Sequence, residues 1–276
     1  MQTLSAHRAR LFTYIMLARP PQLGLDNAAL ARITAMDAPL SKSFPGTVLQ
    51  MEIFGDKELL RVIAALYPYA DRGALFALEW RAILLFARAG MVRSVDWRAP
   101  AMPASQVTLV RVGEGAAAFD TVRVLLAYHK TEQRAFNPRT HAVTLPRDRR
   151  YSGKLDFYPA LLAYTAAAGI ALGKTPAPMF PRYKRTGNGN RGRRADAYPY
   201  GAALADMRFI VRKAGTQAKL YGLHSPRGSG ATLQLALGTP RDEVAWIGLW
   251  ADPASLKKYD RRESELAASV SARMAG

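Results

Sequence analysis

The sequence predicts a mainly α-helical fold with one small antiparallel β-sheet, an α+β fold. Apolar residues recur at three- and four-residue spacings through most of the chain, which is the pattern of amphipathic helices. Only the segment between about residues 107 and 145 carries the alternating, β-branched residues typical of strands. The chain has 276 residues, enough for one large domain or two small ones with a real core.

Residues 1–48 are expected to form a short helical N-terminal extension, or the remnant of a larger domain. The spacing predicts one amphipathic helix over 1–19, which Pro20 and Pro21 end because proline cannot continue a helix interior. A second short helix is expected at 27–35. Two helices are too few for an independent domain, so this region is expected to depend on the rest of the chain for its stability.

Residues 49–276 are predicted to form the main domain. The patterns predict helices at 56–67, 74–89, 154–172, 200–214 and 225–237, strands at 107–112, 121–128 and 142–145, and a last helix at 261–274. Gly90 suits the left-handed position that often ends a helix. The stretch 175–200 is rich in Pro, Gly, Asn and Arg, and it is predicted to be irregular.

The charge of the chain points to a polyanionic partner. Lysine and arginine number 39 against 21 acidic residues, a net charge of +18 that folding itself does not need. A nucleic acid, an anionic membrane or simply a basic solvated surface would each account for it. The charge is spread through patterned, foldable sequence and not confined to a tail, which favours a folded nucleic-acid binder.

Several classes of site are excluded by composition. Cysteine is absent, so disulfides and cysteine–zinc sites cannot form. The histidines lack metal-ligand spacing, and no metal or cofactor is expected; they are His7, His129, His141 and His224. No apolar run reaches the roughly 18 residues of a membrane span. The sequence therefore predicts an intracellular protein, in the nucleoid or the nucleus depending on the host.

One stretch near the C-terminal end combines basic and aromatic side chains in a specific order. In chain order these are His224, Arg227, Trp250 and Tyr259. Ser225 is a good N-cap and Pro226 a good first helical residue, so Arg227 is expected in the first turn of a helix. A helix N-terminus favours an anion such as a phosphate. Asp252, followed by proline, repeats the signal and begins a short helix that ends at Tyr259.

Two further elements lie upstream. Arg93 follows the helix-ending Gly90 closely, and Asp96 comes three residues later. Lys130 begins the connection between the second and third predicted strands. The whole set resembles the catalytic domain of tyrosine recombinases, the phage integrase family, in the order Arg93, Lys130, His224, Arg227, Trp250 and Tyr259. The resemblance covers residues from about 50 to 272.

The resemblance implies chemistry on DNA. The phenol oxygen of Tyr259 would attack a phosphodiester, giving a 3′-phosphotyrosine and a free 5′-hydroxyl. Charge builds on the non-bridging oxygens, and the guanidinium forks of Arg93 and Arg227 match their geometry bidentately. The covalent intermediate conserves the bond energy, so neither ATP nor a metal is needed.

The other members of the set have supporting roles in this scheme. His224 and Trp250 would donate further hydrogen bonds to the phosphate, the tryptophan through its single N–H. Lys130 would be the general acid that protonates the leaving 5′-oxygen, with Lys154 as the alternative. Asp96 would orient the arginines without touching the substrate.

Two neighbours of these residues are expected to have structural roles. Trp246 lies in the same segment as Trp250 and is predicted to be in the core. His129, beside Lys130, is predicted to lie at a strand end.

The irregular stretch carries a basic cluster made of Arg182, Lys184, Arg185, Arg191, Arg193 and Arg194. It is either a mobile loop that follows a phosphate backbone or a solvated loop without a partner. The glycines at 187, 189 and 192 imitate the start of the dinucleotide fingerprint G-x-G-x-x-G, but the last glycine comes one residue early. The required flanking strand and helix are also missing, so no nucleotide site is expected there.

The resemblance implies an enzyme of site-specific recombination, or of integration of a mobile element, acting on double-stranded DNA as a dimer or tetramer. Residues 1–48 would be a remnant of the helical core-binding domain that most members carry. The helix at 261–274 would dock on a neighbouring protomer or close its own core. Two alternatives stay open: a catalytically inactive descendant that only binds DNA, and a tyrosine-dependent topoisomerase or hairpin telomere resolvase.

Overall fold

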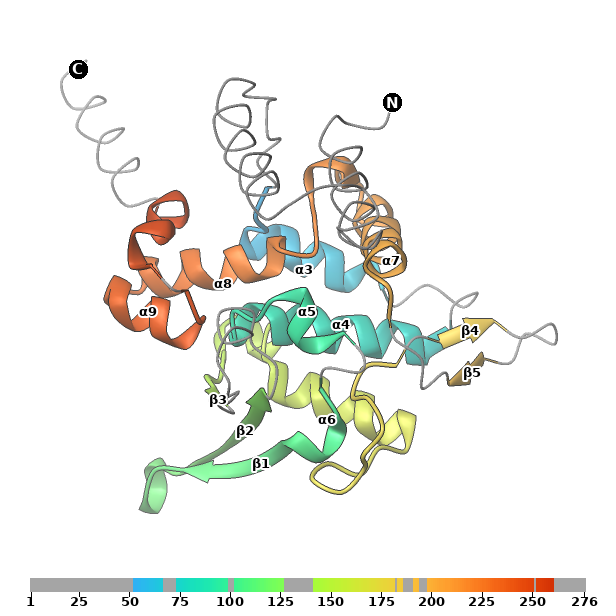
Figure 1. Ribbon diagram of the computed structural model, residues 1–276, viewed down its shortest axis with the longest axis horizontal. Helices are drawn as coiled ribbons and strands as arrows, with labels where there is room; N and C mark the ends of the chain where they lie inside the picture. Colours follow the sequence, from blue (N-terminus) through green and yellow to red (C-terminus); the bar gives the residue numbers. More distant parts are fainter. Residues whose placement is uncertain are drawn as a thin grey trace, which may run out of the picture. The chain divides into compact units, whose positions relative to one another are not determined.

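The computed structural model describes residues 52–66, 73–98, 102–126, 141–181, 198–250 and 252–260, and the backbone of 183–185 and 191–193 (Figure 1). They belong to one compact unit of residues 51–276. The helices predicted within residues 1–48, the helix predicted at 261–274, His129 and Lys130 lie outside the described residues.

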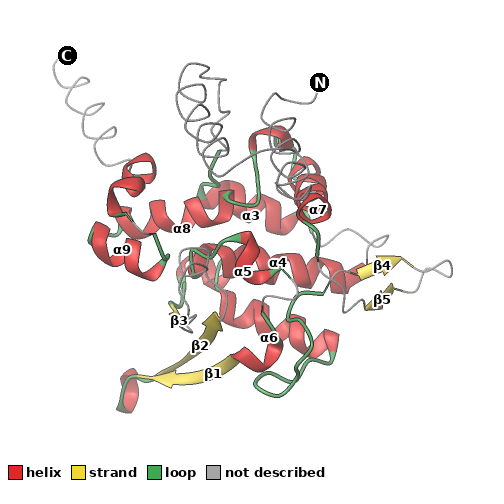
Figure 2. Ribbon diagram, viewed as in Figure 1, coloured by secondary structure: helices red, strands yellow, loops and turns green. Residues whose placement is uncertain are grey.

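The described residues are mainly helical, as the periodicity predicts (Figure 2). The α-helices are α3 (Asp56–Ala64), α4 (Gly73–Ala89), α5 (Ser94–Trp97), α6 (Phe157–Ala168), α7 (Tyr200–Lys213), α8 (Ser225–Ala236) and α9 (Arg241–Ile247). The 3₁₀ helices are η2 (Ala104–Gln106), η3 (Gly115–Ala117), η4 (Arg150–Gly153), η5 (Ala218–Leu220) and η6 (Pro253–Tyr259). Among these residues no helix is long and apolar enough to cross a membrane.

The helix α6 is shorter than the predicted span 154–172, and both of its ends have a physical cause. Asp156 is the N-cap, since its side chain accepts the N–H of Tyr158 at 3.0 Å. Gly169 is the C-cap, and its φ of 63° lies in the left-handed region that stops a helix. Local capping chemistry therefore sets the ends, while the apolar period sets the middle.

The central helix of the core is α4. Every side chain from Ala82 to Ala87 is buried, as expected of a helix that is apolar on all sides. The helix packs against α6 on one side and α8 on the other (Figure 1). Because α8 carries His224 and Arg227 at its start, this packing ties the candidate site to the core.

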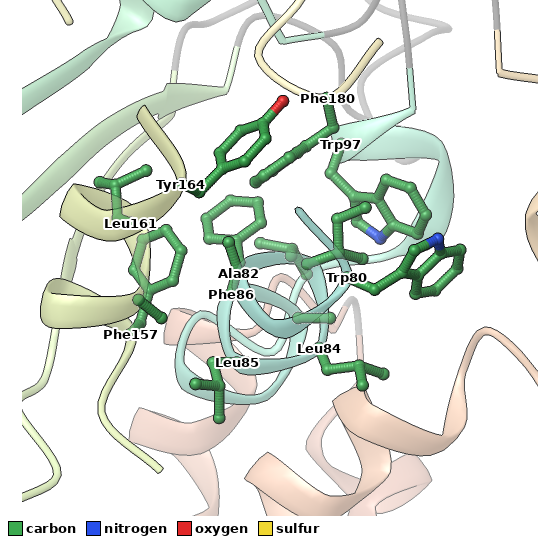
Figure 3. Close-up of a cluster of buried hydrophobic side chains, with 14 of the residues drawn as sticks. Trp80, Ala82, Leu84, Leu85, Phe86, Trp97, Phe157, Leu161, Tyr164 and Phe180 are labelled. Carbon is green, nitrogen blue, oxygen red and sulfur yellow. The ribbon is translucent and has the colours of Figure 1, made fainter. Parts of the chain in front are cut away.

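Aromatic rings fill the space beside α4 (Figure 3). Trp80, Trp97 and Tyr198 stand edge to face around one point, with each pair of ring centroids 6.2 Å apart. Phe180 stacks on Tyr164 at 5.7 Å and meets Trp97 edge-on at 6.4 Å. Such rings contribute through both burial and their preferred edge-to-face geometry. They hold α5, which begins beside Arg93, against the core.

The prediction that 175–200 is irregular is wrong in part. Met179 and Phe180 are buried, and the hydroxyl of Tyr164 donates to the carbonyl of Met179 at 3.0 Å. Further on, β4 (Tyr183–Arg185) and β5 (Arg191–Arg193) pair as antiparallel strands. The buried aromatic anchor and the ladder are long-range features that the Pro- and Gly-rich composition does not disclose.

The predicted three-stranded antiparallel sheet is present. It consists of β1 (Val107–Val112), β2 (Phe119–Leu126) and β3 (His141–Leu145), in that spatial order. Val124 of β2 pairs with Val107 of β1 and Val143 of β3, and all three are buried. The sheet thus has one core-facing side, which accounts for the alternating pattern.

A smaller apolar cluster lies at the end of α8. It consists of Met91, Ala231, Leu235, Val244, Ala245 and Leu256. Trp246 is not part of the core: its side chain is 69 % exposed, so that prediction is wrong. The short helix α9 buries Val244 and Ala245, and the next residue along the helix points to another side.

Candidate active site

The chain leaves α4 through a tight turn that places Arg93 at the start of α5. Met91 occupies the left-handed position, with φ 47°, where the sequence pattern wrongly predicts Gly90. Gly90 meets a different requirement, because a Cβ built on it would lie 2.9 Å from Cδ2 of Leu145. Arg93 is the N-cap of α5, and its backbone N–H donates to Oδ2 of Asp96 at 2.8 Å.

The N-terminal end of α8 carries His224 and Arg227. His224 is the exposed N-cap residue, and Arg227 lies in the first turn as predicted. Ser225 is not the N-cap that the pattern predicts, since its Oγ accepts the N–H of Gly222 at 3.0 Å and so faces the preceding loop. Pro226 is consequently the second helical residue and not the first.

The guanidinium of Arg227 joins three segments of the chain. It donates from Nη1 to the carbonyl of Met91 at 2.5 Å and from Nη2 to the carbonyl of Gly248 at 2.8 Å. Its Cζ lies 3.7 Å from the centre of the Trp250 ring. The residue is only 4 % exposed. This burial and these bonds fix the fork in one orientation.

Arg93 is held in a closely similar way. Its Nη2 donates to the carbonyl of Leu249 at 3.0 Å. Leu249 has φ 58° and Met91 has φ 47°, so both arginines bind a carbonyl of a non-glycine residue in the left-handed region. Such backbone costs of the order of 1–3 kcal/mol per residue and is concentrated at functional sites. The two strained turns position the two guanidinium groups.

The site carries an excess of buried positive charge. Burial, reinforced by the charge of Arg93, lowers the pKa of Arg227 to about 9, although Asp96 and Tyr259 act in the opposite direction. Burial also raises the pKa of Asp96, against the hydrogen bond from the Arg93 backbone and the charges of both arginines. One buried acid therefore compensates two cations. An incoming anion would stabilise this arrangement.

The nucleophile candidate Tyr259 ends η6, which has the predicted cap. Oδ1 of Asp252 accepts the N–H of Ala254 at 2.8 Å. On the other side, the Asp260 carboxylate accepts from Nε and Nη2 of Arg241 at 3.1 and 2.9 Å. The segment carrying Tyr259 is thus fixed at both ends.

The ring of Tyr259 lies against α8 and Trp250. Its centroid is 6.0 Å from that of Trp250, with the planes at 64°. A Cβ built on Gly228 would lie 2.9 Å from Cε1 of Tyr259, so the ring packs on the helix backbone. The hydroxyl of Thr232 donates to the carbonyl of Tyr259 at 3.0 Å. The tyrosine is thereby seated one turn of α8 or less from Arg227.

The structure brings together Arg93, Arg227, Trp250 and Tyr259, with Asp96 beside the arginines and His224 at the start of the same helix as Arg227. Lys130 lies outside the described residues, and its role stays a prediction. The alternative, Lys154, lines a hollow with Arg61 and Tyr151, and none of the four clustered residues lines that hollow.

The basic residues of the irregular stretch are described only in part. The backbone of four of them lies in β4 and β5: Lys184, Arg185, Arg191 and Arg193. Arg182 and Arg194 lie outside the described residues, as do the glycines that imitate a dinucleotide fingerprint.

Two glycines that pattern reasoning overlooks are part of the site. Gly228 leaves room for the ring of Tyr259, and a Cβ on Gly248 would collide with the ring of Trp250. The signal for the first was present in the sequence, because glycine inside a helix is unfavourable and calls for a packing reason. In the described part of the chain, no group of His, Asp and Glu is placed to hold a metal ion.

The fold is that of the tyrosine recombinase catalytic domain. Neither a protein-family model nor a curated protein sequence matches the chain. Among solved structures, the XerH site-specific recombinase bound to a palindromic difH substrate, in a post-cleavage complex, matches 80 % of this chain with a TM-score of 0.54 and 16 % identity. XerA recombinase matches 80 % of the chain with a TM-score of 0.48 and 15 % identity.

The match covers only part of these proteins. The aligned region is 53 % of the XerH chain and 62 % of the XerA chain. The chain therefore spans about half the length of the XerH recombinase that it matches.

Proposed function

We propose that this chain cuts and rejoins double-stranded DNA with Tyr259 as the nucleophile, as a tyrosine-type site-specific recombinase or integrase. The observation that carries the proposal is the seating of Tyr259 on the same turns of α8 that present Arg227, with Arg93 held beside them. Two arginine forks next to a half-buried phenol suit a phosphodiester.

The covalent step balances without an added reactant. The phenol oxygen of Tyr259 forms a bond to phosphorus as the phenol loses its proton, and the bond from phosphorus to the 5′-oxygen breaks. The leaving oxygen takes a proton, from Lys130 in this scheme, and becomes a 5′-hydroxyl. The reverse step, with a 5′-hydroxyl from another strand end, rejoins the DNA and frees the tyrosine.

The arginines have the stabilising role in this step. Negative charge on the non-bridging oxygens would be met by donors that are already oriented by the carbonyls of Met91, Gly248 and Leu249. Pre-orientation matters because donors that need not reorganise stabilise a transition state most. Arg227 uses two of its five N–H donors in these bonds, which leaves three for a phosphate.

His224 and Trp250 complete the phosphate site in the proposal. His224 is exposed at the N-terminal end of α8, where backbone amides also favour an anion. The ring of Trp250 covers one face of the Arg227 guanidinium and meets Tyr259 edge-on. Trp250 would thus order the arginine and the tyrosine in addition to any hydrogen bond from its own N–H.

The proposed partner is double-stranded DNA, on which the chain would assemble as a dimer or tetramer. The net charge of +18 supports a polyanionic partner. The basic cluster around β4 and β5 would follow a phosphate backbone at a distance from the cut.

Covalent trapping tests the proposal. Wild type and Tyr259→Phe would be mixed with a randomised pool of nicked duplexes, in which cleavage releases a short fragment and prevents rejoining. Tyr200→Phe is the matched control, because Tyr200 is 44 % exposed and lies on α7. An SDS-resistant, protease-sensitive DNA adduct is expected from wild type and from Tyr200→Phe, and none from Tyr259→Phe.

The same experiment separates the alternatives. DNA binding without an adduct in every variant would indicate a descendant that only binds DNA. An adduct accompanied by relaxation of supercoils without sequence preference would indicate a topoisomerase. Strand exchange between two duplexes of the recovered sequence is the result that the recombinase proposal requires.

A further inference from the structure

A second hollow lies at the other end of α8 from the arginine cluster. It has a volume of about 230 Å³ and is formed by the end of α4, the segment after β3 and the last turn of α8. Leu237, at its mouth, comes ten residues after Arg227, which is about 15 Å along a helix at 1.5 Å per residue. None of the four clustered residues of the candidate active site lines this hollow.

One wall of the hollow is rigidly built from ion pairs. Arg88 is 4 % exposed and donates to Asp148 at 2.9 Å and to Asp56 at 2.6 Å. Arg150 binds the same two carboxylates at 2.8 and 3.1 Å. Arg147 pairs with an aspartate that is itself 2 % exposed. The wall is therefore fixed before any ligand arrives, which lowers the entropy lost on binding.

The charges of this wall do not balance. Arg88 and Arg150 share two aspartates, and Arg147 has one of its own. Arg149, exposed at the hollow, has no carboxylate partner among the described residues. In addition, Nε of Arg88 is buried without a hydrogen-bond partner in that part of the chain. The hollow thus has a surplus of one cation and an unsatisfied buried donor, and both favour an anion.

The opposite wall is apolar. Leu155, Leu233 and Leu237 line it, and Leu237 remains 64 % exposed. A phosphate backbone brings charge but little apolar surface, so it would leave these side chains uncovered. The volume is also below that of most drug-sized sites, which measure about 300–1,000 Å³. Both observations favour a small ligand with a charged end and an apolar end.

We propose that this hollow binds a small organic anion, a carboxylate or phosphate on an apolar body. The anionic group lies at Arg149, and the apolar body lies against Leu233 and Leu237. This site goes beyond the proposed function and does not depend on Tyr259 chemistry. Its failure would leave the DNA-cleavage proposal untouched, and the reverse also holds.

A titration of the whole chain with phenyl phosphate tests the site, read by NMR from leucine methyl groups and the Gln234 side-chain amide. Gln234 lines the hollow and lies far along α8 from the arginine cluster. Saturable shifts of these signals are expected. Inorganic phosphate and benzyl alcohol, which carry one end each, are expected to bind about tenfold more weakly or worse.

Two variants and one control locate the ligand. Arg149→Gln is expected to weaken phenyl phosphate binding by about tenfold. Leu237→Gln is expected to weaken phenyl phosphate without changing the weak binding of inorganic phosphate. Arg212→Gln, the same change at an exposed arginine of α7 that does not line the hollow, is expected to bind like wild type.

Three results would overturn the proposal. The first is the absence of saturable shifts at Gln234 and the leucines, or shifts confined to the Trp250 indole. The second is equal binding by Arg149→Gln and Arg212→Gln. The third is displacement of phenyl phosphate from this hollow by a short DNA duplex, which would assign the hollow to the DNA interface.

Discussion

Arg227 donates a hydrogen bond of 2.5 Å to the carbonyl of Met91, although 136 residues separate the two in the chain. The carbonyl is available because Met91 takes up a left-handed conformation, φ 47°, directly after the central helix α4. One arginine thereby connects the turn that presents Arg93 with the helix that presents His224. The position of the whole candidate site depends on this contact.

Arg227→Lys is expected to destabilise the fold and abolish DNA cleavage. A lysine cannot hold the carbonyls of Met91 and Gly248 with a planar fork, and its buried ammonium would lack donor–acceptor geometry. The expected loss of unfolding free energy is about 2–3 kcal/mol. Chemical denaturation measures it, with Arg212→Lys on exposed α7 as the control. Unchanged stability would contradict the clamp.

Gly228→Ala is expected to lower adduct formation while the chain stays folded. The new Cβ would lie 2.9 Å from Cε1 of Tyr259, so the phenol must move away from the arginines. A displacement of about 1 Å costs on the order of 100-fold in rate. Single-turnover trapping measures it against Gly201→Ala, whose Cβ meets nothing within 4 Å. Equal rates for the two variants would mean that the ring position is not critical.

Gly230→Ala is expected to destabilise the fold more than Gly228→Ala. A Cβ here would collide with the backbone carbonyl of Arg88 and lie 2.9 Å from Cγ of Met91, so α8 must move away from α4. Overpacking against rigid backbone costs about 1–3 kcal/mol or more. A thermal melt compared with that of Gly201→Ala checks this. A melting temperature equal to that of the control would show that the two helices can separate cheaply.

DNA affinity is expected to fall as pH rises through about 9, because Arg227 has its pKa lowered to about 9 and binds an anion in its protonated form. The folded pKa lies below the ordinary value of 12.5. Burial of this cation therefore costs folding stability below about pH 9, and the cost is relieved as pH rises towards the unfolded pKa. Titrations with Tyr259→Phe avoid ionisation of that phenol. An affinity constant from about pH 8 to about pH 10 would argue against the coupling.

DNA affinity is also expected to fall steeply with salt. With a net charge of +18, binding should release counterions, with a log–log slope of about −0.9 per phosphate neutralised. Neutralising Arg191 and Arg193 of β5 together should reduce the slope by about two if that hairpin follows the backbone. A slope unchanged by the double variant would leave this hairpin outside the interface.

The sequence was sufficient for the elements and for most of the cluster. The apolar period predicted α4, and alternation predicted the sheet, because both patterns are local consequences of one buried face. The order of basic and aromatic residues predicted a shared site for Arg93, Arg227 and Tyr259, which lie together in the structure.

The contacts that hold the site could not be predicted in the same way. The left-handed turns at Met91 and Leu249 are stabilised by arginines far along the chain, and no local propensity favours them. Pattern reasoning assigned the left-handed position to Gly90 and the core to Trp246, because it weighed residue type and not the neighbours that the fold supplies.

Mass spectrometry of the trapped adduct tests the central claim most directly. After nuclease and protease digestion of wild type on a nicked duplex, the residual nucleotide is expected on the peptide that contains Tyr259, linked through a 3′-phosphate. A nucleotide on another tyrosine, or a 5′-phosphate linkage, would contradict the account.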